Sequence, residues 1–255
     1  MRGLENKIAI VTGAGGAIGR AITLRLAEEG CRIGVFDRNG EAAAEPVRLV
    51  QASGGRADAV VVDIVDYAAV AAAVGDFEAS AGATDILVNN AGWDRLVSFL
   101  DSEPSLWDQL IAINLRGPLN MHHVVVRGMA ERRRGRVVNI ASDAGRVGSS
   151  GEAVYSACKG GIIAFTKTLA RELAASGVNL NVVCPGPTET PLLESFLGEG
   201  EQGRKVYEGL KRAIPLRRLG QPADVVGIVA LLASDDAQFI TGQVISVSGG
   251  LTMHG

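Results

Sequence analysis

The amino-acid sequence predicts an α/β fold in which helices cover both faces of a doubly wound parallel sheet. Short β-branched runs alternate with longer helical stretches along the chain, which is typical of strand–helix–strand units. Most of the short runs are almost continuously apolar, as expected of parallel strands that are covered on both faces. Neither a linker nor a repeat divides the 255 residues, so we expect one domain over residues 1–255.

Seven runs are predicted to be strands because each joins apolar, mostly β-branched residues with few interruptions. They are, in chain order, 7–12 (KIAIVT), 31–36 (CRIGVF), 57–62 (ADAVVV), 85–89 (DILVN), 136–141 (RVVNIA), 178–184 (VNLNVVC) and 243–247 (QVISV). The longer segments between them are predicted to be helices. Those helices are 17–29, 41–53, 67–81, 105–133 and 152–176.

The stretch 185–215 is the least regular part of the sequence, because it is rich in Gly, Pro and Glu. Ligands of open parallel sheets bind outside the carboxyl ends of the strands. A long excursion after the sixth strand lies at that edge of the sheet. The sequence therefore predicts a substrate lid near residues 187–215.

Composition and charge argue against several classes of protein. A hydrophobic fraction of 47% and a charged fraction of 21% are those of a soluble globular protein. A net charge of −3 gives no electrostatic attraction to nucleic acid or to an anionic membrane. No run approaches the roughly 20 apolar residues of a membrane span, and Cys31, Cys158 and Cys184 lack metal-ligand spacing. We expect a cytoplasmic protein that binds no metal, nucleic acid or membrane.

A glycine-rich turn follows the first predicted strand directly and leads into an amphipathic helix. Gly13, Gly15, Gly16 and Gly19 let the chain turn sharply and let backbone N–H groups approach a pyrophosphate at the helix N-terminus. A glycine-rich turn alone is a weak indicator, but this one lies between a first strand and a helix. It therefore predicts a dinucleotide site.

The second predicted strand leads into Asp37 and Arg38, which favour different cofactors. The carboxylate of Asp37, about 20 residues after the glycines, would accept hydrogen bonds from the adenosine ribose hydroxyls and repel a 2′-phosphate. An arginine such as Arg38 could hold that phosphate instead. Because Asp37 occupies the strand end itself, the sequence favours NAD over NADP.

The sharpest local pattern is Tyr155 followed four residues later by Lys159. This spacing places both side chains on one face of a helix, one turn apart. A phenol with a pKa of about 10 is a poor base at neutral pH, but a neighbouring ammonium and an oxidised nicotinamide both stabilise tyrosinate. Ser142 stands thirteen residues upstream of Tyr155, at the end of the fifth predicted strand, where its hydroxyl could bind the same substrate oxygen.

Taken together, these residues make the chain resemble the short-chain dehydrogenase/reductase family over nearly its whole length. The features that follow the family's order are the glycine-rich turn, Asp63, 89–92 (NNAG), Asn114, Ser142, Tyr155, Lys159 and the pair Pro185 and Gly186. The resemblance implies a Rossmann-like fold and hydride transfer between a nicotinamide cofactor and a secondary alcohol or ketone. One departure is Ala17, which replaces the middle glycine of the family's commonest turn, TGxxxGxG. We expect it to shift the turn only slightly.

The resemblance also implies a role for each residue. Tyr155 would be the general acid and base, and Ser142 would position the substrate oxygen. Lys159 would lower the pKa of Tyr155 and hold the nicotinamide ribose, while Asn114 would anchor a water that relays the proton. The residues assigned to the cofactor are Gly13, Gly15, Gly16, Ile18, Gly19, Asp37, Asp63, Ile64, Asn90, Ala91, Gly92, Tyr155, Lys159, Pro185, Gly186, Thr188 and Thr190.

Several segments resemble more closely the bacterial 2-hydroxycyclohexanecarboxyl-CoA dehydrogenases, which act in anaerobic degradation of alicyclic and aromatic acids. These segments are 89–94 (NNAGWD), 121–123 (MHH), 141–155 (ASDAGRVGSSGEAVY), 183–188 (VCPGPT) and 246–253 (SVSGGLTM). The likeness implies NAD-dependent oxidation of a ring alcohol beside a CoA thioester. Dehydrogenases of aryl secondary alcohols such as 1-phenylethanol share part of the pattern, so an uncharged aryl or alicyclic alcohol is the alternative substrate.

Two sets of substrate residues correspond to these alternatives. The candidates for direct contact are Trp93, Ser142, Arg146, Val147, Leu192 and Leu193. The phosphates of CoA would meet cations at the rim or lid, namely Arg146, Arg204, Lys205, Lys211 and Arg212. An aryl alcohol would instead meet an apolar wall, to which the lid adds Phe196 and Leu197.

The resemblance further implies a homotetramer with helices 105–133 and 152–176 at one interface and the C-terminal residues 249–255 at another. A cofactor-sensing regulator without turnover is the rival class of function. It predicts damage to the Ser–Tyr–Lys set or an added DNA-binding segment, and the sequence has neither. The sequence therefore favours an enzyme.

Overall fold

Seven strands form one parallel sheet in the structure, a computed structural model that describes residues 1–197 and 200–253. The strands are β1 (Ile8–Thr12), β2 (Arg32–Asp37), β3 (Arg56–Val61), β4 (Ile86–Asn89), β5 (Gly135–Ile140), β6 (Val178–Pro185) and β7 (Val244–Val247). Their order across the sheet is β3-β2-β1-β4-β5-β6-β7, and every neighbouring pair is parallel. The strand order reverses between β1 and β4, where doubly wound folds bind their ligands.

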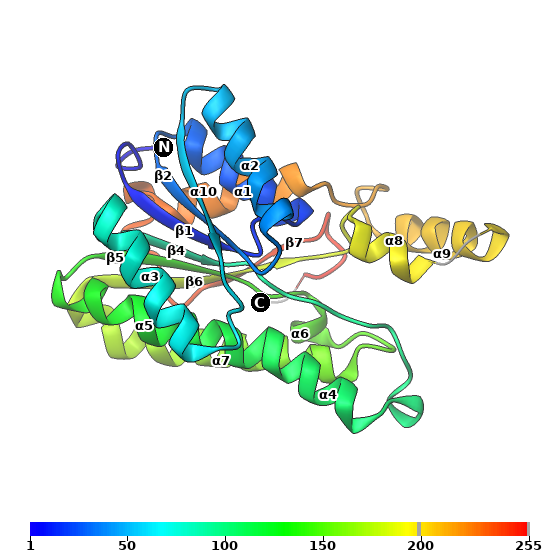
Figure 1. Cartoon of the computed structure of the whole chain (residues 1–255). Helices are drawn as coiled ribbons and strands as arrows, with labels where there is room; N and C mark the ends of the chain where they lie inside the picture. The colour runs from blue at the N-terminus through cyan, green and yellow to red at the C-terminus, as the bar shows by residue number, and fades with distance from the viewer. Residues whose placement is uncertain (198–199, 254–255) are drawn as a thin grey trace.

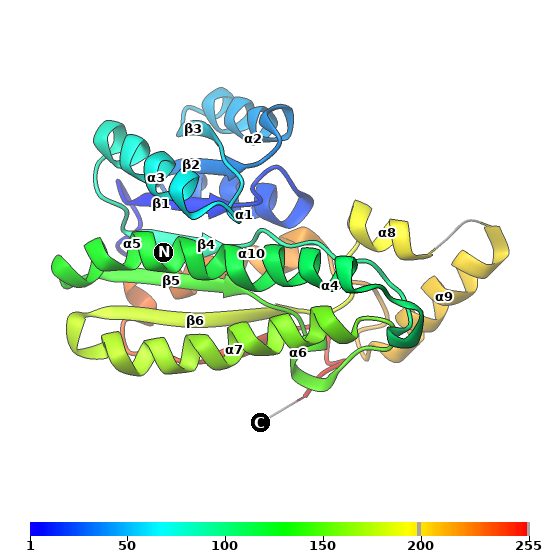
Figure 2. The same cartoon turned by 60° about the horizontal axis from the view of Figure 1, so that its bottom comes forward.

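Helices cover both faces of this sheet, so the predicted fold class is confirmed (Figures 1 and 2). The helices on one face are α1 (Ala17–Glu28), α2 (Gly40–Ala52) and α10 (Pro222–Ala233). Those on the other face are α3 (Tyr67–Ala81), α5 (Gly117–Glu131) and α7 (Ala153–Leu173). The shorter helical pieces are η1 (Phe99–Asp101), α4 (Pro104–Ile111), α6 (Ala144–Val147), η3 (Ala174–Ser176) and η4 (Asp235–Ala237). None of the described helices is both long and apolar enough to cross a membrane.

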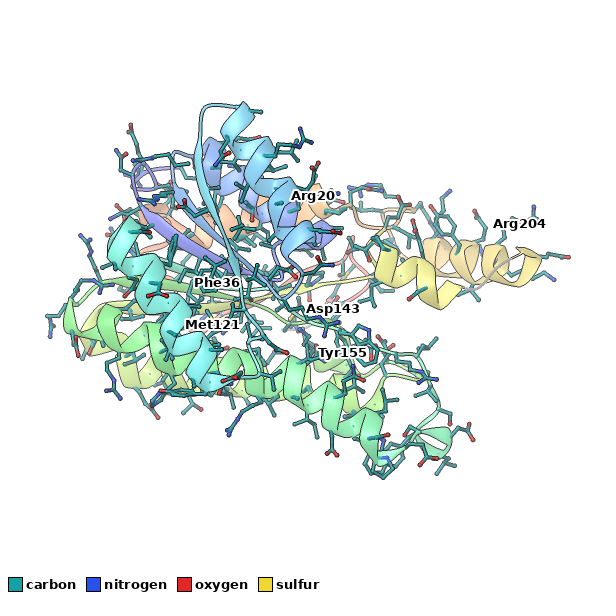
Figure 3. All side chains as sticks on the ribbon, in the orientation of Figure 1. Arg20, Phe36, Met121, Asp143, Tyr155 and Arg204 are labelled. Carbon is teal, nitrogen blue, oxygen red and sulfur yellow. The ribbon has the colours of Figure 1, made fainter. Side chains whose placement is uncertain are left out.

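Each face of the sheet has its own hydrophobic core. On one face, Ile22 of α1 and Val229 of α10 belong to a cluster that also holds residues of β1 and β2. On the other face, Phe77 of α3 meets Phe36 of β2 edge to face, with ring centroids 5.8 Å apart. Phe36 and Met121 of α5 are both fully buried in this second cluster (Figure 3). Because both faces are covered, the strands form a firm base for the side chains at their carboxyl ends.

The predicted helix 105–133 is interrupted in the structure. α4 ends at Ile111, the turn Ala112–Arg116 (η2) has the wider π form, and α5 begins at Gly117. The turn contains Asn114, whose side chain bonds to the backbone of Trp93. A wide turn of this kind commonly marks a functional position.

The excursion after β6 is helical, so the prediction of an irregular stretch was wrong. It contains α8 (Pro191–Leu197) and α9 (Gly200–Ala213), which project from one end of the domain (Figures 1 and 2). The residues that indicated a loop stand at helix starts. Pro191 is the first residue of α8, where proline is well tolerated, and Gly200, with φ of +72°, is the first of α9.

Candidate active site

A cavity of about 900 Å³ lies at the carboxyl ends of the strands, with residues of α8 and α9 on one side. Most of the residues that the sequence singles out line it. They are Gly13, Gly16, Ile18, Gly19, Asp37, Asp63, Ile64, Asn90, Ala91, Gly92, Trp93, Ser142, Val147, Tyr155, Lys159, Pro185, Gly186, Thr188, Thr190, Leu192 and Leu193. Gly15, Asn114 and Arg146 do not line it. Sequence positions up to 180 residues apart are thus brought to one site.

The glycine-rich turn is packed too tightly for larger residues at two of its positions. Gly13 has φ of +59°, and a methyl group there would lie 2.7 Å from the Cα of Ala91. A methyl group on Gly19 would lie 2.3 Å from the carbonyl oxygen of Gly13. The Nδ2 of Asn90 donates to the same carbonyl at 3.0 Å. Ala17 begins α1 without a positive φ, so its methyl group strains nothing.

The N-terminus of α1 has the chemistry of a phosphate site. Gly16 is the N-cap and provides no side-chain cap, so first-turn N–H groups are left without a side-chain partner. Gly16, Ala17 and Ile18 all line the cavity. Free N–H groups and the positive end of the helix dipole suit a pyrophosphate there. The turn therefore fits a dinucleotide.

Asp37 and Arg38 both line the cavity at the end of β2. The carboxylate of Asp37 accepts the backbone N–H of Gly15 at 3.0 Å and that of Asn39 at 3.0 Å. Gly15 thus contacts Asp37 rather than the cavity, and a methyl group on it would lie 2.6 Å from the Cβ of Ala42 in α2. Arg38 is exposed. Two backbone N–H groups fix the Asp37 carboxylate, whereas the Arg38 side chain is exposed to solvent.

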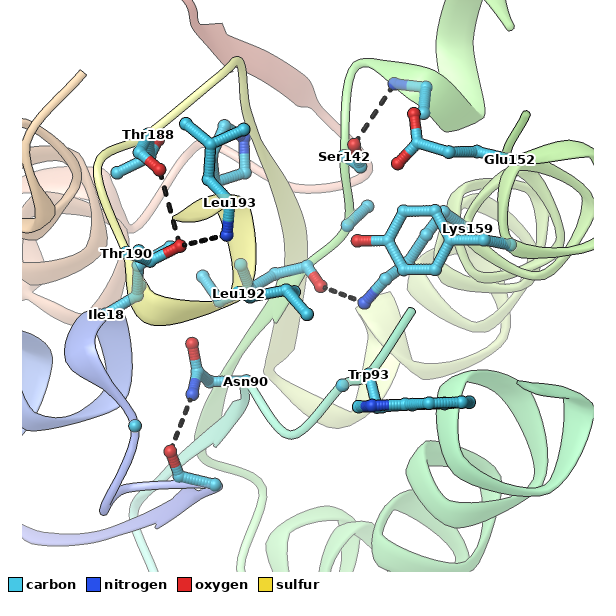
Figure 4. Close-up of a pocket in the computed structure, with 18 of the residues that line it drawn as sticks. Ile18, Asn90, Trp93, Ser142, Glu152, Lys159, Thr188, Thr190, Leu192 and Leu193 are labelled. Carbon is cyan, nitrogen blue, oxygen red and sulfur yellow. Dashed lines mark hydrogen bonds between the residues drawn. The ribbon is translucent and has the colours of Figure 1, made fainter. Parts of the chain in front are cut away.

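Tyr155, Ser142 and Lys159 meet at one end of this cavity. The Nζ of Lys159 lies 5.5 Å from the centre of the Tyr155 ring, one turn away on α7. It is 4% exposed and donates to the carbonyl of Ile140 at 3.0 Å (Figure 4). The hydroxyl of Ser142, just after β5, accepts the N–H of Ala144 at 3.1 Å and lies beside the Tyr155 phenol, whose pKa it lowers.

Burial dominates the protonation of these groups. It raises the pKa of the Tyr155 phenol well above its ordinary value, and the charges of Asp94 and Glu152 raise it further. The hydrogen bond with Ser142 acts in the opposite direction. Burial also lowers the pKa of Lys159 to about 8. Burial and the two carboxyl groups therefore act against the lowering of the Tyr155 pKa that the sequence predicts from Lys159.

Asn114 lies behind the cavity wall and is fully buried. Its Oδ1 accepts the N–H of Trp93 at 3.2 Å, and its Nδ2 donates to the carbonyls of Trp93 at 2.7 Å and Leu110 at 3.0 Å. These partners are all backbone groups, so Asn114 fastens the loop after β4 to the helix that carries it. A methyl group on Gly92 would lie 3.1 Å from this Oδ1 and 3.2 Å from the Nζ of Lys159.

The substrate candidates fall into two groups. Trp93, Val147, Leu192 and Leu193 line the cavity, whereas the Nη1 of Arg146 donates to the hydroxyl of Ser246 at 2.6 Å. The cations expected to meet CoA phosphates, Arg204, Lys205, Lys211 and Arg212, do not line it either. Figure 3 shows Arg204 on the projecting helix α9, well away from Tyr155. The side chains of Phe196 and Leu197 lie outside the described residues.

Three carboxyl groups near the cavity were missed by the sequence analysis. Asp143 and Glu152 line it, and the nearly fully buried Asp94 lies beside Tyr155. Glu152 stands three residues before Tyr155, so helical spacing could have indicated it. Asp94 had no such signal, because only the fold brings it to the helix that carries Tyr155. Within 1–197 and 200–253, no group of three or more His, Cys, Asp or Glu side chains is arranged to hold a metal ion.

Known proteins are similar to this chain over almost its whole length. Residues 13–252 match a family model described as Enoyl-(Acyl carrier protein) reductase. The 3-oxoacyl-(acyl-carrier-protein) reductase of Thermotoga maritima is 36% identical over 250 residues, which cover 98% of this chain and 99% of that protein. Acetoacetyl-CoA reductase of Shinella zoogloeoides is 38% identical over 245 residues, which cover 96% and 98%.

A solved structure has the same fold. Gluconate 5-dehydrogenase from Burkholderia cenocepacia J2315, in complex with NADP and tartrate, superposes with a TM-score of 0.92 at 35% identity. The match covers 98% of this chain and 97% of that one. The chain belongs to the short-chain dehydrogenase/reductase family and is an oxidoreductase that acts on a secondary alcohol or the corresponding ketone.

Proposed function

We propose that this protein oxidises a secondary alcohol to a ketone with NAD, reversibly, and that Tyr155 transfers the proton. The observation that carries the proposal is the single cavity in which Tyr155, Ser142 and Lys159 lie at one end and the glycine-rich turn at the other. In Figure 4, Ser142 and Lys159 stand on one side of this cavity and Ile18 and Thr190 on the opposite side. The arrangement supports hydride transfer across the space between them.

Each catalytic group has a distinct part in this reaction. Ser142 hydrogen-bonds to the substrate oxygen, and ionised Tyr155 takes the hydroxyl proton as the hydrogen on carbon leaves as hydride. The alcohol thereby loses two electrons and becomes the ketone. Lys159, one turn away, stabilises the phenolate. The oxidised nicotinamide, when bound, supplies the hydride acceptor and a second positive charge.

The cofactor-binding residues follow the cavity from the turn toward Tyr155. Asp63 would contact the adenine, with Ile64 beside it, and Asn90 would help to hold the cofactor at the end of β4. Thr188 and Thr190, after β6, would bind the carboxamide or the phosphates. Their hydroxyls already bond to local carbonyls, those of Gly186 at 2.9 Å and Thr188 at 3.3 Å, so the loop is ordered before it meets a ligand.

NAD is the proposed cofactor because the Asp37 carboxylate is held at the ribose position. Two backbone N–H groups fix it there, and a fixed negative charge repels a 2′-phosphate. NADP is the alternative, because Arg38 also lines the cavity and the gluconate 5-dehydrogenase was solved with NADP.

The proposed substrate is a cyclic 2-hydroxyacyl-CoA such as 2-hydroxycyclohexanecarboxyl-CoA. Two of the relatives are named for 3-oxoacyl thioesters, on acyl carrier protein or on CoA. The proposed product has the same chemistry, a ketone two carbons from a thioester carbon. The alternative, an aryl or alicyclic alcohol, is supported by the apolar wall of Trp93, Val147, Leu192 and Leu193.

One experiment separates these substrates. It compares kcat/KM with NAD for 2-hydroxycyclohexanecarboxyl-CoA and for 1-phenylethanol. We expect kcat/KM to be at least about tenfold higher for the CoA thioester, because its long arm adds binding energy outside the reacting centre. A kcat/KM tenfold higher for 1-phenylethanol would instead favour an aryl or alicyclic alcohol as the substrate. The assignment as a dehydrogenase would remain.

A homotetramer and a substrate lid complete the proposal. α5 and α7 lie on the same face of the sheet and are the helices proposed for one subunit interface. α8 and α9 line one side of the cavity and are proposed to cover bound substrate. The protein is proposed to act in the cytoplasm on small molecules.

A further inference from the structure

Two carboxyl groups beside Tyr155 have no part in the proposed reaction. Glu152, directly before α7, lines the main cavity on the side of Ser142 (Figure 4). Asp94, on the loop after β4, is 3% exposed. Asp94, Glu152 and Tyr155 together line a second cavity of only about 10 Å³. The three side chains are therefore close neighbours.

Asp94 is buried without a donor to compensate its charge. Neither of its carboxyl oxygens has a donor partner. Within the part of the chain that the structure describes, no salt bridge reaches Asp94 or Glu152. A buried carboxylate in this position is unfavourable, and a proton shared with a second carboxyl relieves it because the protonated group can donate. Burial and the neighbouring carboxyl group of Glu152 raise the pKa of Asp94 to about 7.

Asp143 is the other buried carboxyl group at this end of the cavity, and it is compensated differently. Its carboxylate accepts the hydroxyl of Ser246. Arg146 donates to the same hydroxyl at 2.6 Å, so a guanidinium lies close to this charge. Among the described residues no ion pair reaches Asp94 or Glu152, and the cation that acts on Asp94 is the ammonium of Lys159 on α7.

We propose that Asp94 and Glu152 share a proton and place a negative charge at the substrate end of the cavity, which makes the enzyme selective for alcohols that are uncharged beside the reacting carbon. The inference rests on the proposed function and narrows its substrate class. A thioester, an ester or an aryl ring is neutral there and is accepted. A free carboxylate next to the alcohol meets a like charge in a partly desolvated site and is rejected.

The test compares 2-hydroxycyclohexanecarboxylate with its methyl ester, which share one ring and one alcohol. The wild-type protein should favour the ester in kcat/KM by about tenfold or more. A carboxylic acid with a pKa of about 4 keeps one charge between about pH 6 and about pH 8.5. The ratio of ester to acid should therefore rise through pH 7, as the pair loses its shared proton.

Two variants assign this behaviour to the pair. Glu152→Gln removes the carboxyl group that faces the substrate and should lower the ester preference about threefold or more. Asp94→Asn removes the partner with which Glu152 shares the proton. The preference for the ester should therefore persist, but the ratio of kcat/KM for ester over acid should no longer rise through pH 7. Asp108→Asn, on the exposed surface of α4, removes one carboxylate elsewhere and should change neither the ratio nor its pH dependence.

Other titratable groups near Asp94 do not produce the same pattern. They are Arg95 beside it and Tyr155, Cys158 and Lys159 on α7. Lys159, with its pKa lowered to about 8, titrates in part of the same range. All four groups remain in the Asp94→Asn protein, and because Asp94 raises the pKa of Lys159, its removal should move the Lys159 titration to lower pH without abolishing it. A rise of the ratio that only shifts to lower pH would therefore come from Lys159, whereas a rise that flattens reports the pair.

The outcomes separate the inference from the proposed function. Equal kcat/KM values for ester and acid in the wild type would overturn the inference and leave the dehydrogenase intact. An ester preference that Glu152→Gln does not change would also overturn it. A protein that oxidises no secondary alcohol with either NAD or NADP would contradict both the inference and the proposed function. The wild-type ratio requires no substitution, so it decides the question even where a variant fails to fold.

Discussion

Asp37 and Arg38 are neighbours in the chain, yet they act in opposite directions on a ribose phosphate. The carboxylate of Asp37 is fixed by the N–H groups of Gly15 and Asn39. Arg38 is exposed, although it also lines the cavity. A charge held in place discriminates better than a mobile one, because the mobile side chain loses rotamer freedom when it binds. The proposed preference for NAD therefore rests mainly on Asp37.

Substitution of each residue tests this preference. Asp37→Ala should narrow the ratio of kcat/KM for NAD over NADP by about tenfold, because it removes the charge that repels the 2′-phosphate. Arg38→Ala is the matched control and should widen the ratio or leave it unchanged. Kinetics with both cofactors at fixed alcohol give the two ratios. A wild-type protein that prefers NADP would show that Arg38 dominates.

Local patterns were enough to find some site residues but not others. Tyr155 and Lys159 lie four residues apart on one helix, so the periodicity of the helix alone brings them together. Asp94 comes near Glu152 only through the packing of the loop after β4 against α7. A single sequence holds no signal for a contact of that kind. The backbone contacts of Asn114 with Trp93 were invisible for the same reason.

The turn between β1 and α1 depends on glycine for space as well as for conformation. Gly19→Ala should lower the free energy of unfolding by about 1–3 kcal/mol, since overpacking a tight site costs that much. The new methyl group would lie 2.3 Å from the carbonyl oxygen of Gly13 and 2.6 Å from the Nδ2 of Asn90. The affinity for NAD should fall as well, because the turn must shift.

A second glycine provides the control for this element. Gly75 is exposed within α3, and a methyl group on it would have no atom within 4 Å. Gly75→Ala should raise the free energy of unfolding by about 0.5–1 kcal/mol, because alanine favours the helix. Urea titrations of both variants give the two values. Equal effects of the two substitutions would contradict the account of the turn.

The strands were easier to predict than the helices of the second half. β1, β2 and β4 to β6 are short runs rich in β-branched and other apolar residues with few polar interruptions, and their length and composition favour strands. α10 was not predicted, because its apolar sequence has no amphipathic period. Its start was nevertheless marked by Pro222 and by Asp224, whose side chain accepts the N–H of Gln221 at 2.7 Å. α9 was not predicted either, because its glycines indicated a loop. Val206 and Leu210 are four residues apart, which is helical spacing, and both line the cavity.

The stability of the whole domain should depend on pH through His122. This ring is buried between the sheet and its covering helices, where Nδ1 lies 2.7 Å from the carbonyl of Pro118 and Nε2 lies 3.1 Å from the amide of Asn139. Burial lowers the pKa of His122 to about 4. Between pH values of about 6.5 and about 4, His122 is protonated in the unfolded chain but neutral in the folded protein. The free energy of unfolding therefore falls as the pH drops from about 6.5 toward 4.

Unfolding at two pH values tests this dependence. His122→Gln should remove roughly 2 kcal/mol of the loss in the free energy of unfolding between about pH 7 and about pH 5. The comparison uses the change with pH, so any constant cost of the substitution cancels. His123→Gln, at an exposed position of α5, is the control and should retain the full loss. The same loss in both variants would show that His122 does not cause it.

The central claim is that Tyr155 transfers the proton while a secondary alcohol gives its hydride to NAD. The most direct measurement is the rate of NAD reduction by wild-type and Tyr155→Phe proteins at saturating alcohol, with the affinity for NAD measured separately. Phenylalanine keeps the ring and removes only the oxygen. We expect unchanged NAD affinity and a rate about 10²–10⁴-fold lower, which is the usual contribution of general acid–base catalysis. A Tyr155→Phe protein that reduced NAD at a rate near the wild-type rate would contradict the assigned mechanism.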